Sequence, residues 1–188
     1  MSHTRLAPVL ALSALSALTL VGCSATYEGA EPAEFASTAC GAWVDGDTTE
    51  SFSKSETVAG LTGSGEEQRD QAIEVVEGMV AGWEQQRDAV AAAKPAVEDG
   101  DAIVGLFSDY YDYRIDTTND LIDDFRGVST DTGEFDEQVR QAAEQLFVEV
   151  EDTGLDAPFP FTEIEDQKVV DAMLADETCT TFLDKRGW

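Results

Sequence analysis

The chain has 188 residues, with 39 acidic against 11 basic side chains, a formal net charge of −28 and a hydrophobic content of 43%. This hydrophobic content is ordinary for a single globular domain and too high for a disordered chain. Binding to nucleic acid depends on basic side chains that neutralise phosphates, so a chain this acidic is not expected to bind nucleic acid. Protein partners with basic patches, and divalent cations, remain compatible with the charge.

The first 22 residues are predicted to be a secretion signal. Arg5 contributes positive charge, and an uncharged apolar run follows over residues 6–20. A run of about 15 residues is shorter than the roughly 20 needed for a helix that spans a bilayer. The run ends in Leu20-Val21-Gly22-Cys23, which resembles the lipobox of bacterial lipoproteins. The overall composition is also similar in style to that of actinobacterial envelope proteins, although no functional family is recognised for the domain that follows.

The lipobox resemblance implies cleavage before Cys23 and attachment of a diacylglycerol, with acyl chains such as palmitate, to its sulfur. Two acyl chains anchor a protein stably, so this lipoprotein would lie at the cell membrane on the extracytoplasmic side. An ordinary signal peptide followed by a chance cysteine is the alternative. The expected organisation is a signal peptide over 1–22, the lipidated cysteine and a short tether over 23–33, and one domain over 34–188. Cleavage removes Arg5 and no acid, which leaves a mature net charge of −29.

The domain is predicted to begin with a short helix over 33–44, followed by a Gly-, Ser-, Thr- and Asp-rich segment over 45–65 that is expected to be mostly loop. Ser64 and Glu67 have the spacing of a capping box, which predicts a long helix over 66–93, ended by Pro95. This helix has an apolar stripe and a second stripe of mostly small residues. The first comprises Ile73, Val76, Met79, Val80, Trp83 and Val90, and the second Val75, Gly78, Gly82, Ala89 and Ala93.

A third helix is predicted over 101–126 and, after a turn at 127–133, a fourth over 134–152 with Gly154 as its C-terminal stop. Residues 156–161 contain two prolines and two phenylalanines and are expected to be extended, covering one end of the domain. Thr162 and Glu165 repeat the capping-box spacing, which predicts a last helix through residue 184. No strand pattern of moderate length occurs. The sequence therefore predicts an all-α antiparallel bundle of about four long helices, with the short first helix clamped across it.

Cys40 and Cys179 remain once Cys23 is assigned to lipidation, one near each end of the domain. Outside the cytoplasmic membrane such a pair usually forms a disulfide, and this one would join the first helix to the last. A two-cysteine metal site is the rival interpretation. No histidine follows His3 to complete such a site, so a structural disulfide and no bound metal or cofactor are predicted.

The third helix has six aspartates in the sector opposite its apolar side, and these form its acidic face. Like charges repel along a helix, so a face of one sign is either a solvated surface, a docking strip for a basic partner, or a weak site for a hard cation such as calcium. No EF-hand loop supports calcium. The six are Asp101, Asp109, Asp112, Asp116, Asp120 and Asp123.

Arg114 lies on the apolar side of the same helix, near Tyr110 and Tyr111. A buried guanidinium must be paired, so one interpretation is an Arg bound to an acid of another helix and to tyrosine hydroxyls. The other is a pocket where Arg114 and the two tyrosines meet an anionic or aromatic ligand. Tyr113 is expected to point away from this side.

The C-terminal residues Lys185, Arg186 and Trp188 could complement a helix dipole or anchor a partner. The mature chain has neither a histidine for a Ser-His or Cys-His pair nor a phosphate-binding Gly-rich loop, so enzyme activity is not expected. A pair of carboxylates alone could catalyse glycoside hydrolysis, so an enzyme that uses only carboxylates is a third and weaker possibility. The sequence favours a lipid-anchored, non-enzymatic interaction module that docks a basic envelope protein, with a small-ligand- or cation-binding lipoprotein as the alternative. It is silent on oligomeric state.

Overall fold

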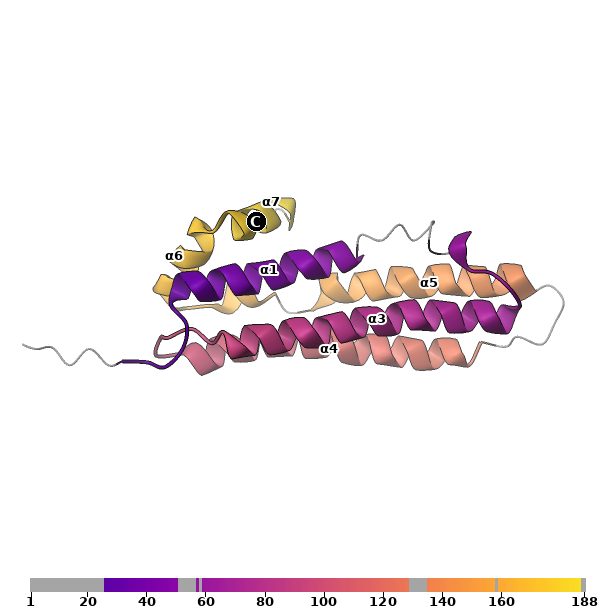
Figure 1. Cartoon of the computed structure of the whole chain (residues 1–188), viewed down its shortest axis with the longest axis horizontal. Helices are drawn as coiled ribbons and strands as arrows, with labels where there is room; N and C mark the ends of the chain where they lie inside the picture. The colour runs from indigo at the N-terminus through magenta and orange to yellow at the C-terminus, as the bar shows by residue number, and fades with distance from the viewer. Residues whose placement is uncertain (1–25, 51–56, 58, 129–134, 158, 187–188) are drawn as a thin grey trace, which may run out of the picture.

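The computed structural model describes residues 26–50, 57, 59–128, 135–157 and 159–186, and its principal elements are helical (Figure 1). The predicted signal peptide and Cys23 lie outside the described residues. The prediction of an all-α bundle is confirmed, and the only strand-like pairing among the described residues is an isolated bridge between Ala30 and Pro95. No helix in this part is long and apolar enough to cross a membrane. The elements are α1 Pro32–Glu50, α3 Gly65–Ala92, α4 Gly100–Arg126, α5 Phe135–Asp156, the 3-10 helix η1 Pro160–Glu163, α6 Gln167–Ala175 and α7 Glu177–Arg186.

The antiparallel pair of α3 and α4 forms the long axis of the molecule (Figure 1). α1 packs on α3 over one part of its length, and α5 packs on both α3 and α4 over the other. The two short C-terminal helices, α6 and α7, pack on the outer side of α1. One half of the bundle is therefore built from α3, α4 and α5, whereas the other contains α1 and the C-terminal helices.

The start of α3 confirms the predicted capping box. Ser64 Oγ accepts a hydrogen bond from the backbone N–H of Glu67 at 3.3 Å, and Glu67 Oε2 accepts one from the backbone N–H of Ser64 at 2.7 Å. Two N–H groups that the first turn cannot satisfy are thereby bonded. The apolar stripe predicted on this helix is buried throughout, and the helix ends at Ala92, before Pro95.

The chain is fixed to the domain at Ala30, earlier than the predicted domain start. Its backbone N–H donates to the Lys94 carbonyl at 2.8 Å, and its carbonyl accepts from the Ala96 N–H at 2.8 Å. Gly29 just before it has φ +149°, and an added Cβ would clash with the Lys94 carbonyl oxygen. Glycine is required there because the backbone conformation and the close approach both exclude a side chain. The part of the predicted 23–33 tether that lies before this attachment is correspondingly shorter than the prediction.

Two helices extend beyond their predicted ends. α1 continues to Glu50, through residues predicted to be loop, and α5 continues past Gly154 to Asp156. Glycine inside a helix costs about 1 kcal/mol, which packing can outweigh. In α5 the extension places Ala157 in the core, with its N–H donating to the Thr153 carbonyl at 3.1 Å. The Gly154 stop and the loop over 45–50 were therefore wrong.

The C-terminal region also differs from the prediction, because aspartates rather than Thr162 cap its helices. Pro160 opens a 3-10 turn instead of extended chain, and α6 starts after Asp166, whose carboxylate accepts from the N–H groups of Lys168 and Val169. Asp176 then ends α6 and accepts from the N–H groups of Thr178 and Cys179 at 2.9 and 3.0 Å, which starts α7. An aspartate in extended conformation at a helix start bonds the free N–H groups of the next turn, so the predicted single helix is divided in two.

A disulfide between Cys40 and Cys179 joins α1 to α7, with the two Cα atoms 5.0 Å apart. Next to it, the Trp43 ring stacks on the rings of Phe107, Phe159 and Phe182, at centroid distances of 5.1, 5.0 and 5.4 Å. These rings come from α1, α4, the segment before η1, and α7. The predicted disulfide and the predicted cover by Phe159 are therefore both present at one end of the bundle.

Candidate functional site

The acidic face of α4 is exposed, but half of its aspartates have basic partners. Asp112 binds Arg87 of α3 at 2.6 Å, Asp101 binds Lys94 at 3.0 Å, and Asp123 binds Arg126 at 2.7 Å. The sequence predicts charges of one sign on this face when α4 is taken by itself. Two of the three bases come from α3 or from just beyond its end. Asp109, Asp116 and Asp120 form no ion pair with any described residue, and we call them the unpaired aspartates.

Tyr113 lies among the unpaired aspartates and is 39% exposed. At 100° per residue, Asp109, Asp116 and Asp120 fall within about 60° of Tyr113 around the helix axis. An aromatic ring with its edge in solvent thus lies between carboxylates of one sign. This confirms that Tyr113 points away from the apolar side of α4.

A groove between α4 and α5 begins beside Tyr113. It consists of two adjoining hollows of about 260 and about 200 Å³, both lined by Leu121 and Glu149. Apolar side chains of both helices and several acids line it, and none of the described lining residues is basic. The lining of this α4–α5 groove is Tyr113, Thr117, Leu121, Asp124 and Phe125 of α4, Val128 just after α4, and Ala142, Gln145, Leu146, Glu149, Asp152 and Thr153 of α5.

Arg114 lies in the closed core rather than in a groove. It is 2% exposed, its guanidinium carbon lies 4.1 Å from the centroid of the Trp83 ring, and its Nη1 donates to the Tyr110 hydroxyl at 3.2 Å. A cation over an aromatic face is stabilised by the ring quadrupole, by about 2 kcal/mol where water is excluded. The tyrosine hydroxyl predicted as part of the shell is present. A ligand could reach this group only if the helices separated.

Tyr111 packs edge-on against Tyr110 and is 1% exposed. Burial raises the pKa of Tyr111 far above its ordinary value of 10.0, and the charges of Tyr110 and Asp45 raise it further. Its hydroxyl has no hydrogen-bond partner among the described residues. Tyr111 is therefore a neutral core residue at neutral pH, and a ligand site at Arg114, Tyr110 and Tyr111 stays a prediction.

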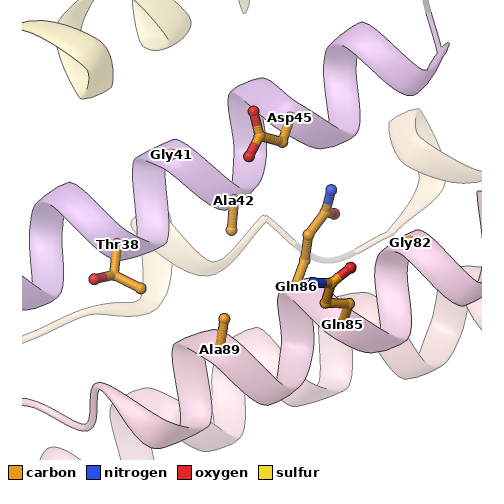
Figure 2. Close-up of a pocket in the computed structure, with 8 residues that line it drawn as sticks. All are labelled: Thr38, Gly41, Ala42, Asp45, Gly82, Gln85, Gln86 and Ala89. Atoms are coloured by element: carbon orange, nitrogen blue, oxygen red, sulfur yellow. The ribbon is translucent and has the colours of Figure 1, made fainter.

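A second groove lies between α1 and α3 (Figure 2) and has a volume of about 420 Å³. Part of the small-residue stripe of α3 lines it, and a Cβ added at Gly41 or Gly82 would meet no atom within 4 Å. Gln86 extends from α3 toward α1 in this groove, and its Oε1 is buried without a hydrogen-bond partner among the described residues. The lining residues are Thr38, Gly41, Ala42, Asp45, Gly82, Gln85, Gln86 and Ala89.

The described residues contain no group of three or more acids, cysteines or histidines arranged to hold a metal ion. The side chains of Lys185 and Arg186, and all of Trp188, lie outside the described part, so the possible C-terminal anchor stays a prediction. Sequence reasoning missed both grooves, because each depends on which two helices pack together. The stripe of mostly small residues on α3 contributes Gly82 and Ala89 to one of them.

No protein-family model matches the chain, and no significant similarity to a curated protein or a solved structure is found. The function is therefore argued from the chemistry of these surfaces.

Proposed function

We propose that the protein is a lipid-anchored, extracytoplasmic interaction module that docks a basic region of another cell-envelope protein on the acidic face of α4. The observation that carries this proposal is the line of unpaired aspartates around Tyr113. Asp116 and Asp120 are one helical turn apart and repel each other by a few tenths of a kcal/mol. A basic partner would relieve that repulsion, and partly exposed tyrosines are common among the residues that dominate binding energy at protein interfaces.

The lipobox and the disulfide support the envelope location. Disulfides persist mainly in oxidising compartments, and the one between Cys40 and Cys179 joins segments 139 residues apart. Anchoring through Cys23 would place the domain near the bilayer, and its acidic charge would keep it off an anionic surface. The absence of a histidine from the mature chain supports a non-enzymatic role, because Ser-His and Cys-His mechanisms need one.

The test is isolation of the full-length protein from gently solubilised native membranes, with mass spectrometry of what co-purifies. We expect a stoichiometric basic protein that dissociates at high salt. The variant D109N/D116N/D120N is expected to lose it. The matched control E74Q/E84Q/D184N removes the same charge from exposed acids elsewhere and is expected to keep it. Retention of the partner by the first variant would contradict the proposal.

A second candidate function is binding of a small ligand in the α1–α3 groove, and the buried Oε1 of Gln86 favours it. A ligand with an N–H donor would satisfy that oxygen, and a positive charge would suit the nearby Asp45 carboxylate, so a small organic ammonium compound fits best. Native mass spectrometry of the purified protein should show such a compound. The variant G82L, whose side chain would occupy the groove, should lose it. Wild-type protein that carries no small molecule would exclude this second function.

A further inference from the structure

We infer that the partner docks through a basic amphipathic helix whose apolar side lies in the α4–α5 groove, between two acidic rims. This inference rests on the proposed function, because it identifies the kind of segment that the acidic face of α4 receives. It adds a second helix, an apolar floor and a defined position to the docking site.

The floor of the groove is suited to apolar side chains. Leu121 of α4, Val128 just after it and Ala142 of α5 are only partly buried, although they pack against the hydrophobic core. Phe125 and Leu146 close the groove beneath them. Covering this floor would remove apolar surface from water, which is favourable by about 25 cal/mol per Å².

The charged side chains of described residues that line the groove are all acidic. Asp124 lines it from α4, and Glu149 and Asp152 line it from α5. Asp120 lies one helical turn before Asp124, about 40° from it around the axis of α4, and therefore flanks this rim. A polar rim around an apolar centre is the usual anatomy of a protein interface. Lysines and arginines that flank the apolar side of a helix would meet carboxylates on both sides.

The length and surroundings of the groove favour a helix as its occupant. The lining residues of α4 extend from Tyr113 to Phe125, about 18 Å along the helix axis, and the lining continues to Val128 just beyond the helix. A partner helix of about 15 residues would cover this length. Any pair of packed helices has a groove on each side, and α3 packs against both α4 and α5. In this half of the bundle α1 does not run alongside α5 (Figure 1), so an added helix would complete a four-helix bundle.

The experiment compares groove variants with the charge variant in the same co-isolation from membranes. A142F would fill the groove and L121N would make its floor polar, and neither changes a charge. We expect each to reduce the co-isolated partner at least tenfold, whereas A81F, which adds the same bulk at an exposed alanine of α3, should leave it unchanged. Circular dichroism and urea unfolding of all variants establish that the fold is retained.

A synthetic probe tests the same site without the native partner. A 15-residue amphipathic Lys/Leu helix is titrated against the full-length protein in detergent, beside a scrambled peptide of the same composition. We expect binding of the amphipathic peptide at least tenfold tighter than that of the scrambled one, and weakened at least tenfold by A142F and L121N. Equal binding of the two peptides, or full binding to both groove variants, would overturn the inference. If D109N/D116N/D120N loses the partner but A142F and L121N keep it, the proposed function stands and the groove is excluded as the docking site. If none of these variants loses the partner, both the proposed function and the inference fail.

Discussion

Removal of the Cys40–Cys179 disulfide is expected to destabilise the protein strongly, because the bridge closes a very long loop. Its ends are 139 residues apart. In the chain-entropy model, closing a loop of this length raises the free energy of the unfolded state by about 5 kcal/mol, which is an upper value. Native domains are stable by only about 5–15 kcal/mol, so a loss of that size in the variant C40A/C179A would be a third or more of the total.

Part of that loss should appear as local opening of the C-terminal helices. α6 and α7 pack mainly on α1 and on each other, and α7 has ten residues, too few for stability as an isolated helix. Without the bridge, α7 is held by the packing of a few buried side chains, among them Phe182 and Leu183, and by the turn at Asp176. The region over 167–186 is therefore expected to open more readily than α3 and α4.

Urea unfolding followed by circular dichroism measures the global loss, and hydrogen exchange with mass spectrometry measures the local one. We expect a lower urea midpoint for C40A/C179A and faster exchange over 167–186 than over α3. Wild-type protein treated with reductant should behave in the same way, which separates the bridge from the alanine side chains. An unchanged midpoint, or exchange at wild-type rates in the C-terminal helices, would refute the reasoning.

Substitutions at four further positions test the core, the helix cap and the buried tyrosine. W43A removes a ring that stacks on three others and should cost about 3–5 kcal/mol in urea unfolding, whereas W43F should cost clearly less. S64A should cost about 1 kcal/mol, because it removes the cap of α3. Hydrogen bonds from Ser64 lower the pKa of Glu67 below its ordinary value of 4.5. The ionised Glu67 therefore contributes to the free energy of unfolding at neutral pH, and this contribution is lost as the carboxylate is protonated below pH 4.5. E67A should abolish that part of the acid dependence of unfolding. Burial raises the pKa of Tyr111, so the unfolded state loses the tyrosine proton at a lower pH than the folded state, and the free energy of unfolding should fall above pH 10. Y111F should reduce this alkaline dependence. At pH 7 its free energy of unfolding should lie within about 1 kcal/mol of the wild-type value. A Y111F variant with the wild-type alkaline profile would show that other groups cause it.

Elements with a local chemical signal could be predicted from the sequence. The capping box at Ser64 and the apolar stripe of α3 follow from residue types and spacing, and the disulfide follows from the number of cysteines and the compartment that the lipobox implies. The division between α6 and α7 also has a local signal, because Asp176 is a good helix cap, but the apolar pattern continues across it and favoured one helix. The extension of α5 through Gly154 has no such signal, since it depends on the burial of Ala157 among other helices.

Only part of the candidate docking site could be predicted from the sequence, because the rest depends on packing between helices. The acidic face was visible in the spacing of the aspartates along one helix. The pairing of Asp112 with Arg87 was not, because it joins α4 to α3, and it changes which carboxylates remain available. The α4–α5 groove was also hidden, since Leu121 and Ala142 belong to different helices and become neighbours only through packing.

The position of the groove relative to the proposed anchor constrains the partner. The chain is fixed at Ala30 beside the connection between α3 and α4, which is also where α4 begins. Leu121, in the middle of the groove, lies 21 residues further along α4, or about 32 Å from that end. The seven residues from Cys23 to Gly29 span at most about 23 Å. Repulsion between the acidic domain and anionic lipid favours an orientation with the groove away from the bilayer. A basic helix immediately next to the membrane would then be poorly placed, so the docking helix is expected in an ectodomain or in a protein that is not itself embedded in the membrane.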